Sequence, residues 1–270
     1  MNTIRGRVES KLQRMTFPLL HHARQNANRR FYKKHHGQRC FILCNGPSVL
    51  KQNLLPLRNE VVMSVSSGYL HKDYMDIGPA YHFLPSLTYG LMTEQDFVAW
   101  FNEMDEKLGK AEVFLASTEY QLVKRHSLFA KRTVNYLHTV GQFEHVSSRI
   151  IDITGTVPVI GSAPIMCLIA ALYMGFKEIY LLGTDHDSLI TREYKYSFEP
   201  TLLKGKDPSV DNAGKIRVPL YDELKAYLVL WEQYRHVKSI AQENGICIYN
   251  ASAGGILDEF PRVELEKVLG

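Results

Sequence analysis

Two stretches of the sequence join strongly apolar runs to small polar residues. The first is RCFILCNGPSVL at residues 39–50, and the second is GSAPIMCLIAALYMGFKEIYLLGTD at residues 161–185. The residues that could do chemistry there are Asn45, Gly46 and Ser48 in the first, and Gly161, Ser162 and Asp185 in the second. Backbone N–H groups and a serine hydroxyl at a helix start suit a phosphate, and a carboxylate after a strand suits ribose hydroxyls. The structural alternatives are a simple helix cap for Ser162 and a turn cap for Asp185.

The region after Asp185 is a candidate active-site lid. Residues 185–224, DHDSLITREYKYSFEPTLLKGKDPSVDNAGKIRVPLYDEL, are rich in Lys, Gly, Pro and Asp, which predicts a lid over about residues 186–220. Its one histidine, His186, lies between Asp185 and Asp187. We expect these carboxylates to raise the pKa of the imidazole and to orient it as a general base. A surface or capping histidine is the alternative.

Phenol hydroxyls and cations later in the same region suit a developing negative charge. Tyr194 and Tyr196 alternate with the cations Arg192 and Lys195. We expect the two tyrosines to stabilise a departing phosphate, and an ordinary strand or loop is the alternative. Asp185 and Asp187 also form a D-x-D pair that could hold Mg²⁺ or Mn²⁺. The sequence contains neither G-x-G-x-x-G nor G-x-x-x-x-G-K-[ST], so a dinucleotide or P-loop site is not indicated.

Alternating apolar runs and helical patterns position these residues. Runs typical of buried strands occur at CFILC, EVVMSVS, AYHFLP, AEVFLAS, EIYLLG and ICIYNAS. A helix or turn is predicted around residues 49–58. Helices are predicted over TEQDFVAWFNEMDEKLG, from about Ala163 to Met174, and from about Tyr221 to Asn244. Strands that alternate with helices and are apolar on both faces indicate a mostly parallel sheet with helices on each side. We therefore predict a Rossmann-like α/β fold over residues 39–270.

Such a sheet would gather the candidate residues at one edge. Ligands of open parallel sheets bind outside the carboxyl ends of the strands. Ser66 and Ser67 follow the second predicted strand and Ser86 follows the third. These serines should therefore face one crevice together with Asn45 and Asp185.

The first 38 residues form a basic leader. It carries nine lysines and arginines, followed directly by Arg39, against the single acid Glu9, with Leu12, Met15 and Phe17 among the apolar residues between them. This pattern is compatible with an amphipathic helix on an anionic membrane surface, or with a basic arm that packs on the domain or pairs subunits in a homo-oligomer. No nucleic-acid module signature follows, so a nucleic-acid partner is not expected.

The remaining composition is that of an ordinary globular protein of 270 residues, 45% hydrophobic and 22% charged. The four cysteines lie in or beside apolar runs without a C-x-x-C pair, which favours reduced, buried thiols. No run is long enough to span a membrane, and no signal peptide is evident. We expect a cytoplasmic protein, with peripheral binding to the inner face of the membrane as an option.

FILCNGPSVL and the stretch at residues 161–185, in this order and at this separation, resemble the nucleotide-binding segments of the bacterial sialyltransferases of glycosyltransferase family 42. They equally resemble 6-hydroxymethylpterin diphosphokinase-like (MptE-like) domains of bacterial polysaccharide biosynthesis, as does the ending IYNASAGGILDEFPRVELEKVL. The sialyltransferase resemblance implies metal-independent, inverting transfer from a CMP-sugar, without a cofactor. It implies donor contacts at Asn45 and Ser162. It also implies a lid histidine that acts as the general base and two lid tyrosines that contact the phosphate. Where that family has two further Asn residues, this chain has Ser66 and Leu84.

Three functions remain open at this stage. The first is a CMP-sugar-dependent glycosyltransferase that acts on a capsular or lipopolysaccharide acceptor, either a glycan or a glycolipid. The second is a hydroxymethylpterin diphosphokinase, which would need ATP and Mg²⁺ and would use Asp185 and Asp187 as metal ligands. The third is a nucleotide-binding module without catalytic activity. A metal requirement separates the second from the first.

Overall fold

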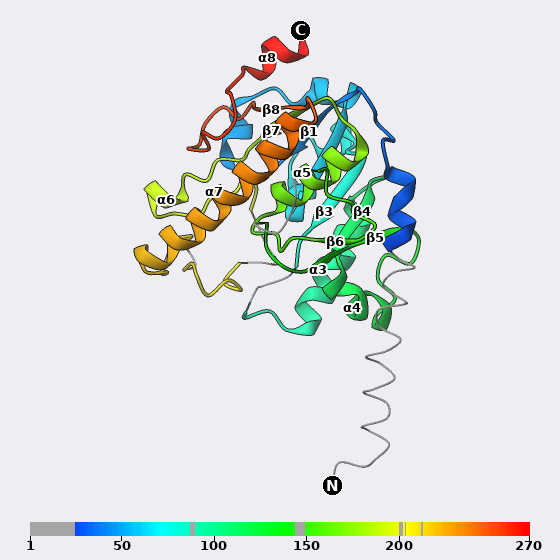
Figure 1. Cartoon of the computed structure of the whole chain (residues 1–270). Helices are drawn as coiled ribbons and strands as arrows, with labels where there is room; N and C mark the ends of the chain where they lie inside the picture. Colours follow the sequence, from blue (N-terminus) through cyan, green and yellow to red (C-terminus); the bar gives the residue numbers. More distant parts are fainter. Residues whose placement is uncertain (1–24, 87–89, 144–148, 200–201, 203, 212) are drawn as a thin grey trace.

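A single parallel sheet forms the centre of the computed structural model, which describes residues 25–86, 90–143, 149–199, 202, 204–211 and 213–270 (Figure 1). Its eight strands lie in the order β6-β5-β4-β3-β2-β1-β7-β8, and each neighbouring pair is parallel. The strands are β1 (Arg39–Leu43), β2 (Val61–Val65), β3 (Tyr81–Leu84), β4 (Glu112–Ala116), β5 (Val134–Thr139), β6 (Thr156–Val157), β7 (Glu178–Leu182) and β8 (Cys247–Asn250). The predicted Rossmann-like α/β fold is confirmed.

Helices cover both faces of the sheet. The longer helices are α3 (Glu94–Lys107), α5 (Ala163–Met174) and α7 (Leu220–Glu243). The shorter ones are η1 (Ala27–Phe31), η2 (Pro47–Lys51), η3 (Leu55–Asn59), η4 (Ser66–Leu70), α2 (Tyr74–Ile77), η5 (Ser117–Glu119), α4 (Tyr120–Arg125), α6 (Ser188–Thr191) and α8 (Leu265–Leu269). Helices α5 and α7 pack on one face, while α3 packs on the opposite face over β3 and β4 (Figure 1).

Burial on both faces explains the continuous apolar runs of the strands. In β1, Cys40 and Ile42 point toward α5, whereas Phe41 and Leu43 point into the core on the other face. Successive strand side chains point to opposite faces, so a strand covered by helices on both sides needs apolar residues at every position.

Helix α5 is the most buried helix of the fold. Ser162 precedes it in an extended conformation, and Gly175 ends it in the left-handed region with φ +80°. All residues from Pro164 to Met174 are buried, because the helix lies between the sheet and α7. An all-round apolar helix is what this position requires.

Two parts of the chain add detail to the sequence-based expectation. The helix or turn predicted around residues 49–58 takes the form of two short 3₁₀ helices, η2 and η3, rather than one continuous helix. Pro56 explains the interruption, since it lacks an N–H and its ring would clash with the carbonyl of Gln52 in a continuous helix. Strands β5 and β6 were not predicted; β5 mixes polar and apolar residues, and β6 has only two residues.

The described part of the leader packs on the domain. Phe31 is fully buried against Phe114 and Tyr81, at ring-centroid distances of 4.9 and 6.0 Å. The Asn28 amide donates to the carbonyls of Tyr136 (2.9 Å) and Ile153 (3.0 Å). Residues 1–24, which carry the predicted amphipathic pattern, lie outside the described residues, so membrane binding by the leader stays a prediction. Within the described ranges no helix is both long and apolar enough to cross a membrane.

We expect Phe31→Ala to destabilise the fold by about 3–5 kcal/mol, because it removes a fully buried aromatic ring and leaves a cavity. Urea denaturation followed by circular dichroism would measure this change. Leu50→Ala is the matched control, since Leu50 is 55% exposed and its truncation should cost less than about 1 kcal/mol. A loss at Phe31 no larger than at Leu50 would show that the leader is not part of the folded core.

Candidate active site

A cavity of about 340 Å³ lies at the carboxyl ends of β1, β2 and β7. From β1 the sheet extends through β2 to β6 on one side and through β7 and β8 on the other. The cavity therefore lies at the switch point where the strand order reverses, which is where open α/β sheets bind ligands. Its lining includes Asn45, Gly46, Ser66, Ser67, Gly161, Ser162, Asp185, His186, Asp187, Tyr194, Lys195, Tyr196 and Tyr227.

All of the site residues predicted from the sequence except Ser48 and Ser86 line this cavity. Ser48 lies directly behind the lining and holds Asp185. Ser86 follows β3 and accepts a long hydrogen bond from the Thr118 hydroxyl at 3.4 Å. The carboxyl ends of the parallel strands thus bring the predicted residues together as expected.

The carboxylate of Asp185 is occupied by Ser48. The Ser48 N–H donates to Asp185 Oδ2 at 2.8 Å, and the Ser48 hydroxyl donates to Asp185 Oδ1. Burial raises the pKa of Asp185, and the two hydrogen bonds from Ser48 oppose that rise. This geometry favours a structural role for Asp185 in joining the turns after β1 and β7, over the predicted role of binding ribose.

Glycines allow the turns after β1 and β7 to meet. A Cβ at Gly46 would lie 2.5 Å from the Gly183 oxygen and 2.6 Å from Asp185 Cγ, and the Gly46 N–H already donates to Gly183 O at 2.9 Å. A Cβ at Gly255, which has φ +80°, would lie 2.3 Å from Asp185 Cα. Gly46 therefore contributes close backbone packing, and its N–H is not free to bind a phosphate.

The pKa of His186 differs from the prediction. Its Nε2 lies 2.8 Å from the Tyr234 hydroxyl, and its ring lies edge-on to Tyr227, Trp231 and Tyr234. Burial among these rings lowers the pKa of His186 to about 4. The expectation that neighbouring carboxylates raise this pKa is wrong, because the Asp185 carboxylate points to Ser48 and desolvation dominates. The imidazole is neutral at pH 7.

A hydrogen bond from α3 holds the turn after β2. Ser66 has a left-handed backbone with φ +48°, which is uncommon for a residue with a side chain. The hydroxyl of the next residue, Ser67, accepts a hydrogen bond from Trp100 Nε1 at 3.0 Å. Backbone strain of this kind persists only where surrounding contacts fix it and is concentrated at functional sites.

The loop that leads into α5 is fixed by a residue that the sequence analysis missed. Gln233 of α7 accepts the Gly161 N–H at 2.8 Å and donates to Val159 O at 3.1 Å. These bonds direct the N-terminus of α5, with its partial positive charge, toward the cavity. The sequence signal that could have identified Gln233 is a polar residue within the apolar stripe of α7 that Leu230, Tyr234 and Val237 form.

The predicted lid lies against the opening turn. Residues 192–216 carry two antiparallel bridges, Glu193 with Lys215 and Val210 with Ile216. The Ser197 N–H donates to Asn45 O at 2.9 Å, which brings Tyr194, Lys195 and Tyr196 to the cavity. Desolvation raises the pKa of Tyr194 to about 12, so its hydroxyl stays protonated and can donate. Lys195 pairs with Glu193 at 2.6 Å.

Asn45 offers a buried acceptor. Its Oδ1 atom is shielded from solvent and has no hydrogen-bond partner among the described residues. Buried polar atoms without a partner are rare in native proteins and call for a specific explanation. A donor group on a bound ligand would provide one. By contrast, no three His, Cys, Asp or Glu side chains in the described ranges gather closely enough to hold a metal ion.

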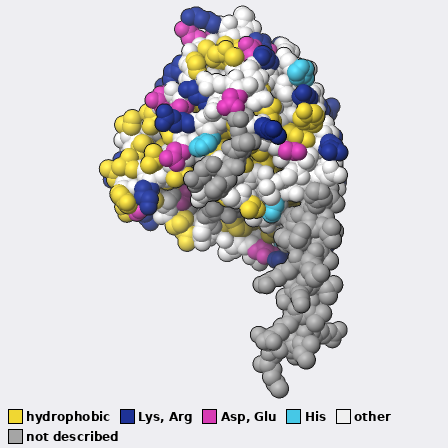
Figure 2. Space-filling view, viewed as in Figure 1, with side chains coloured by type: hydrophobic (Ala, Val, Ile, Leu, Met, Phe, Trp, Pro, Cys, Tyr) yellow, Lys and Arg dark blue, Asp and Glu magenta, His cyan; other side chains and the backbone are white. Residues whose placement is uncertain are grey.

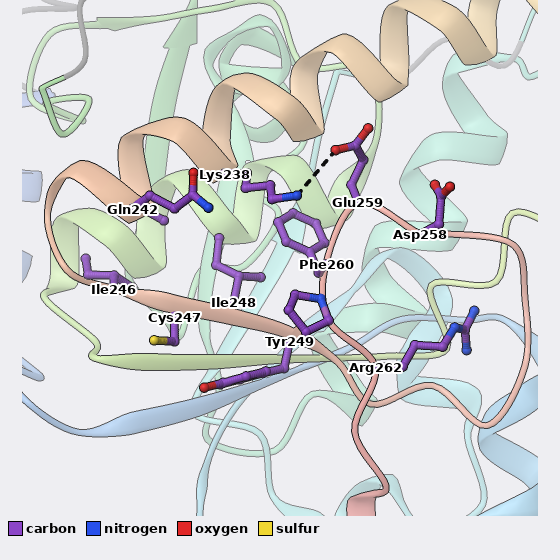
Figure 3. A pocket seen from close by; sticks show the side chains of 12 residues that line it. Lys238, Gln242, Ile246, Cys247, Ile248, Tyr249, Asp258, Glu259, Phe260 and Arg262 are labelled. Atoms are coloured by element: carbon purple, nitrogen blue, oxygen red, sulfur yellow. Dashed lines mark ion pairs between the residues drawn. The ribbon is translucent and has the colours of Figure 1, made fainter.

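A second cavity, of about 720 Å³, lies between β8 and the C-terminal half of α7 (Figure 3). Its charged groups already bind one another or the backbone: Lys238 pairs with Glu259 at 3.7 Å, and Arg262 donates to Gly254 O at 3.0 Å. Cys247 is exposed there, contrary to the prediction of four buried cysteines, because β8 is the edge strand. The polar groups of this cavity do not converge on a ligand position.

No protein family model and no curated protein matches the chain. Four solved chains match, and they include the following three. The MAf glycosyltransferase from Magnetospirillum magneticum AMB-1 aligns over 90% of this chain and 38% of its own, at 15% identity and a TM-score of 0.47. This chain thus spans well under half of that protein.

The sialyltransferase CstII from Campylobacter jejuni, in complex with a substrate analogue, cytidine-5'-monophosphate, aligns over 84% of this chain and 87% of its own, at 15% identity and a TM-score of 0.41. A CST-II variant in complex with CMP aligns over 82% and 84%, at 15% identity and a TM-score of 0.43. At this level the likeness concerns the course of the chain, and the activity has to be argued from the site itself.

The buried His186 should make stability depend on pH. The unfolded imidazole has a pKa of about 6.5, and burial lowers the folded value to about 4. As the pH falls, the unfolded state binds the proton first, so stability is lost between these two values. We expect His186→Gln to remove about 2 kcal/mol of the loss between pH 7 and pH 5, measured by urea denaturation. His36→Gln, at an exposed site, is the matched control; matching profiles for wild type and His186→Gln would contradict the burial effect.

Proposed function

We propose that the protein is a glycosyltransferase that takes sialic acid or a related sugar from a CMP donor and transfers it to a cell-surface glycan or glycolipid. The observation that carries the proposal is the composition of the switch-point cavity. The N-terminus of α5, two tyrosine hydroxyls and Lys195 line one space of about 340 Å³. The resemblance of residues 39–50 and 161–185 to sialyltransferase segments supports the choice of CMP.

The charge of the cavity suits one phosphate. Lys195 is the one Lys or Arg side chain among the described lining residues. Together with the α5 dipole and the hydroxyls of Tyr194 and Tyr196, it matches the negative charge of a departing nucleoside monophosphate. A diphosphate leaving group would require more positive charge or a divalent metal.

The unpartnered oxygen of Asn45 suits a nucleoside. Cytosine carries an exocyclic amino group, and ribose carries hydroxyls, and either can donate a hydrogen bond to Asn45 Oδ1. Such a bond would satisfy an acceptor that is otherwise buried without a partner. We assign Asn45 to donor binding on this basis.

Metal-independent transfer is supported by the state of the D-x-D pair. Both oxygens of Asp185 bind Ser48, which leaves Asp187 as the one unengaged carboxylate of the pair. A Mg²⁺-dependent diphosphokinase would need both carboxylates as ligands. We therefore favour direct displacement at the anomeric carbon with inversion, in which Tyr194 and Tyr196 stabilise the phosphate.

An apolar surface adjoins the cavity, and we propose that the acceptor binds on this side. Figure 2 shows hydrophobic side chains gathered over α6 and the first half of α7, where Ile190, Leu224 and Leu228 are exposed. A groove of about 350 Å³ between α6 and α7 shares Tyr227 with the donor cavity. This continuity supports an acceptor with an apolar part next to its sugar.

Asn45→Ala tests the nucleotide site. We expect CMP to raise the melting temperature of the wild type without Mg²⁺, because it binds the folded state only. The variant should lose about tenfold or more in CMP affinity, since it loses one buried hydrogen bond. Titration calorimetry would give the affinities, with Asn59→Ala at an exposed site as the matched control. Unchanged affinity would remove Asn45 from the site, and stabilisation by ATP only with Mg²⁺ would favour the diphosphokinase.

Lys195→Ala should lower kcat/KM for a CMP-sugar by about 10- to 100-fold, because it removes the cation nearest to the proposed phosphate position. The measurement is CMP release followed by chromatography. Lys215→Ala is a suitable control, since Lys215 lies in the same lid but is exposed and does not line the cavity. Equal effects of the two substitutions would indicate a general change in the lid rather than a phosphate contact.

A further inference from the structure

Three consecutive side chains after β7 could take a proton from an acceptor hydroxyl. Asp185, His186 and Asp187 all line the cavity. A general base must combine free access to the acceptor with a lone pair that no other group occupies. The structure separates the three residues by this criterion.

The first two residues are engaged elsewhere. Both Asp185 oxygens accept hydrogen bonds from Ser48 in a buried position. The His186 Nε2 atom is bonded to the Tyr234 hydroxyl at 2.8 Å, and burial lowers the pKa of this imidazole to about 4. The bond to Tyr234, rather than the pKa, is what distinguishes His186 from a side chain without a partner.

Asp187 is the free carboxylate of the cavity. Its backbone oxygen accepts the N–H groups of Ile190 and Thr191, both at 2.9 Å, which fixes the position of its main chain. Its side chain is partly exposed and forms no hydrogen bond or ion pair with any described residue. The backbone is thus held, while the side chain belongs to a residue that lines the cavity and has no hydrogen-bond or ion-pair partner among the described residues.

We infer that Asp187 is the general base of the transfer reaction. This inference rests on the proposed function. An Asp187 oxygen takes the proton of the acceptor hydroxyl, and the freed oxygen lone pair forms the new bond to the anomeric carbon. The bond from that carbon to the phosphate oxygen breaks, and its electron pair leaves with CMP. The carboxylic acid then returns its proton to water.

The titratable neighbours of Asp187 come from its own segment, from the lid and from α7. The pKa of Lys195 is raised first by its hydrogen bond to Glu193 and to a smaller extent by Asp187. The pKa of Tyr227 is raised first by burial and also by Asp187. The titratable groups around Asp187 are therefore Asp185 and His186 on its own segment, Glu193, Tyr194, Lys195 and Tyr196 of the lid, and Tyr227 of α7.

The test compares Asp187→Asn with Asp222→Asn, a control at an exposed position of α7 outside the cavity. CMP release from CMP-N-acetylneuraminic acid and from CMP-3-deoxy-octulosonic acid is measured with water as the acceptor. We expect Asp187→Asn to lower kcat by about 100- to 1,000-fold. CMP affinity should stay within about threefold of the wild type, and the control should keep wild-type kcat.

Sodium azide distinguishes a base from a merely structural residue. Azide attacks the anomeric carbon as an anion and has no proton to lose, so it should restore CMP release in Asp187→Asn and yield the sugar azide. Wild-type kcat in Asp187→Asn, or a loss that azide does not restore, would overturn the inference.

Failure of the proposed function gives a different result. A wild-type protein that neither binds CMP nor releases it from either donor would contradict the proposed function, and with it the role of Asp187. A wild type that binds CMP and turns over donor, together with an active Asp187→Asn, would overturn the inference alone.

Discussion

The contact between Ser48 and Asp185 joins the two halves of the sheet at the place where ligands can bind. Two hydrogen bonds run from Ser48 to the Asp185 carboxylate, from the turn after β1 to the turn after β7. Gly46 and Gly255 allow this approach because any side chain there would collide with residues 183 or 185. The cavity lies next to this contact, at the place where the strand order reverses: from β1 the sheet continues through β2 on one side and through β7 on the other.

The rest of the site divides into a rigid wall and a charged cover. The wall consists of the start of α5, which Gln233 fixes, and the turn after β2, which Trp100 holds through Ser67. The cover carries Tyr194, Lys195 and Tyr196 and rests on the backbone of Asn45. A fixed wall with prearranged donors limits reorganisation when charge develops on a leaving group. This division supports group transfer over simple nucleotide storage.

Much of the fold was predictable because its strands are buried on both faces. Apolar runs located β1 to β4, β7 and β8, and the glycine after Met174 located the end of α5. Strand β5 was missed because its polar residues Asn135 and His138 interrupt the apolar run. The helix or turn predicted around residues 49–58 forms two short 3₁₀ helices, because Pro56 prevents a continuous helical hydrogen-bond ladder.

The sequence by itself determined which residues reach the switch point, because residues that follow parallel strands meet at one edge of the sheet. Only the tertiary structure decided what each of these residues is free to do. Asp185, His186 and Asp187 are adjacent in sequence, yet the first binds Ser48, the second binds Tyr234 and the third remains open. The physical reason is that the partners come from η2, directly after β1, and from α7, both distant in sequence, and burial sets the charge of His186.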